Sequence, residues 1–156
     1  AAAPVRLEVL DAEGALVATA ESAVEGGTAA VAVHLPQPHA WSPDDPYLYQ
    51  LWLTYGDDAV SSYCGFRTVE MHRDDKGRPR VFLNGEPLFV RGVLDQAYWS
   101  DGLMTAPADE ALVFDIQAMR DAGFNLMRKH IKVEAARWYW HCDRLAGSTH
   151  GPYNSR

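Results

Sequence analysis

The chain has 156 residues, of which 47% are hydrophobic and 22% charged, and its formal net charge is −7. This composition is ordinary for a globular protein with one medium-sized core or two small ones. The acidic balance argues against partners that require a basic surface, such as nucleic acid or an anionic membrane, and no run approaches the roughly 20 consecutive apolar residues that span a bilayer. The two cysteines, Cys64 and Cys142, match no metal-ligand or redox spacing, so we expect two free thiols.

Residues 1–72 carry the pattern of β-structure. Val5–Leu10 alternates apolar and polar side chains, as a half-buried strand does. Further strands are expected at residues 16–20, 28–35, 48–55 and 61–69. Short strands separated by turn residues are typical of an antiparallel sandwich. A complete immunoglobulin-like sandwich has about seven strands in about 100 residues, so about five strands in this stretch predict an incomplete one.

A polar segment, residues 73–80, contains Gly77 and Pro79 and is predicted to link two domains. After it, two apolar runs flank the dipeptide Asn84-Gly85. This dipeptide between apolar runs is typical of a hairpin closed by a type I′ turn. The sequence therefore predicts that a second domain opens with a hairpin.

Residues 81–145 are then expected to alternate strands and helices. The expected elements are a helix over residues 109–122, a strand over 125–130 and a helix over 133–145. Leu112, Ile116 and Met119 form the apolar stripe of the first helix, and Gly123 supplies its stop signal. Alternation of strands with helices predicts parallel βα units.

Polar side chains near the expected ends of the parallel strands are the candidate binding residues. They are Arg91, Asp95, Gln96, Arg128 and His130. Parallel barrels carry their active sites at the C-terminal ends of the strands. Alternation places Arg128 and His130 on one face and Lys129 on the other, and burial of Arg128 and His130 is costly unless they serve a polar site. The structural alternatives are an Arg91–Asp95 ion pair beneath a loop and a solvated basic strand end.

Several motifs in combination resemble glycoside hydrolase family 2, which includes β-galactosidases, β-glucuronidases and β-mannosidases. In the second half they are Leu83-Asn-Gly-Glu-Pro-Leu88, Arg91-Gly-Val93, Asp121-Ala-Gly-Phe-Asn-Leu-Met-Arg-Lys-His-Ile-Lys132 and Trp138-Tyr-Trp-His-Cys-Asp-Arg-Leu145. In the first half they are Trp41-Ser-Pro-Asp-Asp-Pro-Tyr-Leu-Tyr49 and Gly65-Phe-Arg67. Each motif alone is modest, and their order along the chain makes the resemblance specific.

The resemblance covers about residues 28–145 and implies a fold in two parts. An N-terminally incomplete, immunoglobulin-like β-sandwich occupies residues 1–72, and the first two βα units of a (β/α)8 barrel occupy residues 81–145, after the linker 73–80. The family continues with a hydrophobic third strand, whereas residues 146–156 are polar and contain turn residues. We therefore predict disorder, and no buried parallel strand, in this tail.

The resemblance also implies a retaining glycoside hydrolase that acts on O-glycosyl bonds of β-linked sugars and uses no organic cofactor or metal. Retention requires two carboxyl groups about 5 to 5.5 Å apart. In the family these are glutamates on later barrel strands, which the 156 residues do not include, so the chain alone is predicted to be inactive. Arg128 matches the family arginine that keeps the nucleophilic glutamate ionised, and His130 is expected to help line the pocket.

One alternative class is a non-catalytic β-sandwich module that binds carbohydrate or a protein partner. In that case the βα segment has no function of its own. An incomplete barrel would also expose apolar strand edges, which predicts self-association of the chain.

Overall fold

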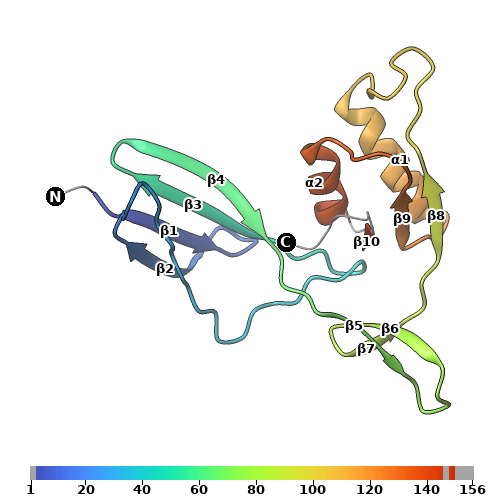
Figure 1. Ribbon diagram of the computed structural model, residues 1–156, viewed down its shortest axis with the longest axis horizontal. Helices are drawn as coiled ribbons and strands as arrows, with labels where there is room; N and C mark the ends of the chain where they lie inside the picture. The colour runs from blue at the N-terminus through green and yellow to red at the C-terminus, as the bar shows by residue number, and fades with distance from the viewer. Residues whose placement is uncertain (1–2, 146–147, 150–156) are drawn as a thin grey trace. The chain divides into compact units, whose positions relative to one another are not determined.

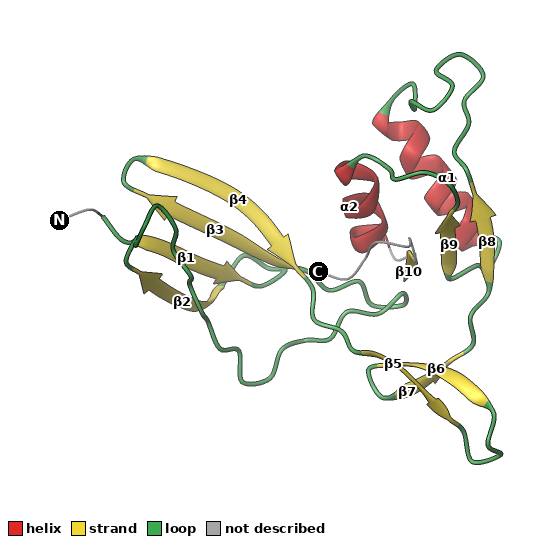
Figure 2. Ribbon diagram, viewed as in Figure 1, coloured by secondary structure: helices red, strands yellow, loops and turns green. Residues whose placement is uncertain are grey.

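In a computed structural model, the described residues are 3–145 and 148–149, and they form ten strands and two helices (Figures 1 and 2). Internal contacts divide the chain into two compact units. The first unit is Ala1–Trp41 with Tyr47–Phe66, and the second is Ser42–Pro46 with Arg67–Arg156. No helix in the described part of the chain has the length and apolarity that crossing a membrane requires.

The first unit is built on a four-stranded antiparallel sheet in the order β2-β1-β3-β4. Its strands are β1 (Val5–Leu10), β2 (Leu16–Ser22), β3 (Tyr49–Tyr55) and β4 (Asp58–Cys64). Alternation along β1 buries Leu7 and Val9, which pack with Tyr49 of β3 in one apolar cluster. The alternating pattern of the sequence thus identified the buried face of this sheet.

The prediction of a strand over residues 28–35 is wrong, because the structure assigns no strand there. Val31, Val33 and Leu35 nevertheless pack against the apolar cluster of the sheet, while the residues between them are exposed. The alternation therefore reports burial correctly. A strand also needs a hydrogen-bonded neighbour, and none of the described strands pairs with this segment.

The second unit opens with a three-stranded antiparallel sheet in the order β5-β6-β7. Its strands are β5 (Val69–Arg73), β6 (Pro79–Leu83) and β7 (Glu86–Leu88). Asn84 and Gly85 both have positive φ, 52° and 83°, which is the type I′ geometry expected between β6 and β7. The segment predicted as a linker, residues 73–80, forms part of a hairpin in the structure. Arg73 pairs with Pro79 between β5 and β6, so most of this segment is a turn.

Parallel βα units follow, as predicted. The elements are β8 (Gly92–Asp95), α1 (Asp109–Asp121), β9 (Leu126–Lys129), α2 (Ala136–Leu145) and β10 (Ser148–Thr149). β8 and β10 pair with β9 in parallel, and the apolar stripe of α1 packs against Met127, Trp138 and Cys142. Gly123, with φ of 83°, follows the end of α1 and donates its N–H to Arg120, as a helix stop does.

The C-terminal tail contains one short strand. Residues 148–149 form β10, which pairs in parallel with β9, where the polar sequence predicted disorder and no buried parallel strand. Strand pairing uses backbone N–H and C=O groups, so a polar sequence does not prevent it. The predicted disorder of residues 146–147 and 150–156 concerns positions outside the described residues.

Candidate functional site

The parallel register between β8 and β9 decides which side chains share a face. Val93 lies opposite Met127, Leu94 opposite Arg128, and Asp95 opposite Lys129. Met127 and Lys129 are 4% and 2% exposed beneath the helices, whereas Leu94 is 57% exposed and Arg128 is also exposed. The predicted alternation is confirmed, and Arg128 lies on the sheet face that the two helices do not cover.

Two of the predicted site residues meet where β8 and β9 end. The side-chain Nε2 of Gln96 lies 2.9 Å from Nδ1 of His130. The amide NH2 group of Gln96 donates to Nδ1 when the ring of His130 carries its proton on Nε2. In that tautomer the pair offers a bound ligand one N–H donor from His130 and one carbonyl acceptor from Gln96.

Asp95 does not pair with Arg91, which was the structural alternative. Its carboxylate contacts the ammonium group of Lys129 and accepts a 2.7 Å hydrogen bond from the backbone N–H of Ala97. Because β8 begins at Gly92, Arg91 lies at the opposite end of the strand from Asp95 and Gln96. The sequence motif had suggested that all three lie near one strand end, and the structure separates Arg91 from the other two.

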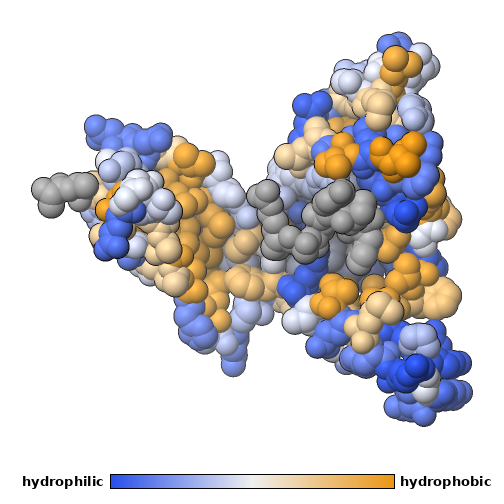
Figure 3. All heavy atoms as spheres, viewed as in Figure 1, coloured by the Kyte–Doolittle hydropathy of each residue, from blue (hydrophilic) through white to orange (hydrophobic). Residues whose placement is uncertain are grey.

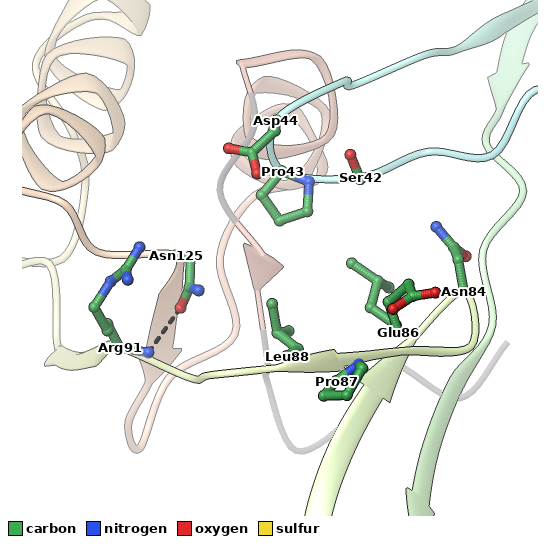
Figure 4. A pocket seen from close by; sticks show the side chains of 10 residues that line it. Ser42, Pro43, Asp44, Asn84, Glu86, Pro87, Leu88, Arg91 and Asn125 are labelled. Carbon is green, nitrogen blue, oxygen red and sulfur yellow. Dashed lines mark hydrogen bonds between the residues drawn. The ribbon is translucent and has the colours of Figure 1, made fainter.

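Arg91 belongs instead to a pocket at the N-terminal end of β8 (Figure 4). Its backbone N–H donates to Asn125 Oδ1 at 2.8 Å, and its Nε donates to the carbonyl of Gly123 at 2.6 Å. The pocket, about 270 Å³, is also lined by Asp44, Glu86 and Pro87. In parallel barrels residues at this end serve stability, and these contacts tie the start of β8 to the start of β9.

Three charged residues of the site region were not predicted. Lys129 is buried, and the side chains of Lys132 and Glu134 are only 6% and 7% exposed. Glu134 Oε1 lies 3.1 Å and 3.0 Å from the two ammonium groups. Glu134 precedes α2, which begins at Ala136. A signal was present, since alternation already placed Lys129 beside the apolar Met127, where a charge needs a partner.

Three carboxylates of this unit, those of Asp95, Asp115 and Glu134, interact with the ammonium group of Lys129. Asp95 and Glu134 are held by lysine ammonium groups. Burial raises the pKa of Asp115 on α1, an effect that the charge of Asp95 increases and that of Lys129 reduces. No three His, Cys, Asp or Glu side chains among the described residues gather closely enough to hold a metal ion.

Comparisons with known proteins agree with this architecture. The family model "Glycosyl hydrolases family 2" matches residues 1–67. A β-galactosidase of Halalkalibacterium halodurans is 30% identical over 142 residues, which is 87% of this chain and 13% of that enzyme. The β-glucuronidase of Faecalibacterium prausnitzii superposes with a TM-score of 0.79 at 31% identity, over 96% of this chain and 23% of that one.

A Bifidobacterium dentium β-glucuronidase, solved with coumarin-3-O-glucuronide, has the same fold over 96% of this chain, with a TM-score of 0.84 and 23% identity. The β-rich first unit, the parallel βα units and these matches place the chain among the glycoside hydrolases. Within that class it belongs to glycosyl hydrolases family 2. The chain spans between an eighth and a quarter of the length of these three relatives.

Proposed function

We propose that this chain supplies the immunoglobulin-like sandwich domain and the first two βα units of the catalytic (β/α)8 barrel of a retaining glycoside hydrolase. The parallel order of β8, β9 and β10 supports this assignment, because a barrel repeats such units. The observation that carries the proposal is the Gln96–His130 hydrogen bond where β8 and β9 end. Barrels of this type bind their substrates at that edge.

The proposed reaction is hydrolysis of O-glycosyl bonds of β-linked sugars in carbohydrate metabolism. Relatives named β-galactosidase and β-glucuronidase support a terminal β-galactoside or β-glucuronide as the substrate. Gln96 and His130 bind sugar hydroxyls through the carbonyl and the Nε2–H group. Arg128, on the uncovered face of the sheet, holds the nucleophilic carboxylate in its ionised form by Coulomb attraction. Asp95 supports the site through Lys129 and does not contact the sugar.

The 156-residue chain alone is inactive in this proposal. Retention needs an acid/base carboxyl group and a nucleophilic carboxylate. The family resemblance assigns both to strands that these 156 residues do not include, and Asp95 and Glu134 are already engaged by lysines. Purified chain is therefore expected to give no turnover of p-nitrophenyl β-galactoside or β-glucuronide above the buffer rate.

A chimera tests the assignment directly. Residues 3–145 would replace the aligned segment of the F. prausnitzii β-glucuronidase, which supplies the rest of the barrel. We expect hydrolysis of p-nitrophenyl β-glucuronide, and we expect Arg128→Met to lower kcat roughly a hundredfold through loss of an electrostatic contact. Arg137→Met, at an exposed arginine of α2, is the matched control and should leave kcat unchanged.

The outcomes separate the hypotheses. Turnover by the chain alone would contradict the proposed inactivity. A folded chimera that is insensitive to Arg128→Met would remove Arg128 from the site. Binding of β-glycosides by the chain, together with a folded but inactive chimera, would favour the alternative of a non-catalytic carbohydrate-binding module.

A further inference from the structure

Four charged side chains form a buried network beneath the Gln96–His130 pair. The ammonium group of Lys129 contacts the carboxylate of Asp95, lies 3.1 Å from Glu134 Oε1, and stands 4.2 Å from the ring centre of Trp138. Lys132 Nζ lies 3.0 Å from the same Glu134 oxygen. The chain contains only three lysines, and two of them are committed to this network.

The loops that leave β8 and β9 are strained at matching positions. Ala97 follows Gln96 and has φ of 46°, and Ile131 follows His130 and has φ of 55°. Leu103, in the first of these loops, has φ of 52°. Residues other than glycine rarely adopt this left-handed conformation, which persists only when surrounding contacts enforce it.

The network supplies those contacts. Asp95 accepts a hydrogen bond from the N–H of Ala97, and its own carbonyl accepts one from the N–H of His130 at 3.0 Å. Lys132 Nζ donates to the carbonyls of Ala97 at 3.2 Å and Met104 at 2.7 Å. The charged side chains of Asp95 and Lys132 thus hold the first loop by its backbone atoms, and Lys132 itself belongs to the second loop.

We propose that Asp95, Lys129, Lys132 and Glu134 are positioning residues that fix Gln96 and His130 in one geometry, a role that rests on the proposed function of that pair. Stability alone is a weak reason to bury such charges, because an apolar replacement of a buried ion pair is often as stable. Apolar side chains could not hold the carbonyls of Ala97 and Met104, whereas Lys132 does. Pre-organised side chains lower the cost of orienting a substrate.

The test uses the full chain labelled with 15N at histidine, because the nitrogen shifts of His130 report its tautomer and the hydrogen bond to Nδ1. Lys132→Met and Glu134→Gln are expected to move the Nδ1 shift of His130 toward that of a free imidazole. They should also speed hydrogen exchange of the Ala97 amide by about tenfold or more, since hydrogen bonds to charged groups are worth about 1.5–3 kcal/mol. Lys132→Arg, which keeps the N–H donors, should give the His130 shift and the Ala97 exchange rate of the parent chain.

Lys76→Met, in the β5–β6 turn, is the control for loss of one lysine charge and should change neither signal. Folded Lys132→Met and Glu134→Gln chains with the His130 spectrum of the parent would overturn the proposal. Lys132→Met and Lys132→Arg chains that give the same His130 shift and the same Ala97 exchange rate would overturn it as well. An inactive chimera together with an intact His130 signature would count against the proposed function alone.

Discussion

A single ammonium group, that of Lys129, joins two carboxylates from different segments of the chain. Its side chain is buried, and Asp95 and Glu134 beside it are largely shielded from water. Each partner compensates the desolvation of the other. Removal of this cation would take from Asp95 its lysine partner and leave Glu134 with Lys132 alone.

Lys129→Met is therefore expected to destabilise the second unit by about 3–5 kcal/mol, the cost of breaking a buried ion pair. Urea unfolding, followed by the amide signals of α1 and β9, measures this loss. Adding Asp95→Asn to the variant should recover part of it, because Glu134 keeps Lys132 as its ion-pair partner and Asp95 no longer carries a charge. A Lys129→Met chain within about 0.5 kcal/mol of the parent, the range of ordinary surface changes, would contradict the ion-pair account.

Residue-level expectations from the sequence succeeded where alternation decided them. The opposite faces of Arg128 and Lys129 follow from the two-residue period of a strand, and the structure has them so. Alternation could not predict which cation pairs with Asp95. The pairing depends on where β8 begins, and because β8 runs from Gly92 to Asp95, Arg91 lies at the opposite end of the strand from Asp95.

Among the elements, the β5–β6 hairpin depends on one carboxylate. Asp74 accepts hydrogen bonds from the Arg78 side chain at 2.9 Å, from the backbone N–H groups of Arg78 and Lys76, and from the Arg80 side chain at 3.1 Å. The Arg78 side chain, followed by these other donors, holds the pKa of Asp74 well below its usual range. This turn is the segment predicted as a linker, because polar residues with glycine and proline are typical of both.

The lowered pKa of Asp74 gives the hairpin a pH dependence of known sign. Its contribution is complete above the unfolded pKa of about 4 and is lost as the pH falls through the lower folded pKa. We expect the amide shifts of Lys76 and Arg78, whose N–H groups donate to Asp74, to stay constant from pH 7 to 4 and to change below that. In Asp74→Asn they should be altered already at pH 7 and show no such step. A step of equal size in that variant would contradict the assignment.

Residues 28–35 show the limit of sequence patterns at this scale. Val31, Val33 and Leu35 are packed as a strand would pack them, yet the backbone has no ladder partner among the described strands. Hydrophobic period reports which side chains are buried. It does not report whether a neighbouring strand is present, and that decides whether a β-strand forms.

For the whole molecule, hydrophobic patches interrupt an otherwise largely hydrophilic surface (Figure 3). Parallel sheets are normally covered on both faces, but Leu94 on β8 is 57% exposed on the face opposite the helices. Phe89 and Ile131, near the ends of β8 and β9, are also exposed. We expect this face to drive the self-association that the sequence predicted.

Leu94→Glu should reduce that self-association, since a charge on an apolar face opposes its burial in a contact. Sedimentation velocity over a range of concentrations measures the change. Leu16→Glu is the matched control, because Leu16 is 54% exposed on β2 in the other unit. Equal effects of the two substitutions would mean that net charge, and not this sheet face, governs association.

Each of the two units contains one cysteine whose rate of alkylation can be measured. Cys64 ends β4 in the first unit, and Cys142 lies in α2 of the second, where it is 0% exposed. Burial raises the pKa of both thiols, and only a thiolate that meets reagent is alkylated. The rate of modification at the buried Cys142 therefore reports opening of the second unit, whereas the rate at the partly buried Cys64 reports local exposure in the first unit. Mass spectrometry of the unaltered chain measures both rates in one experiment.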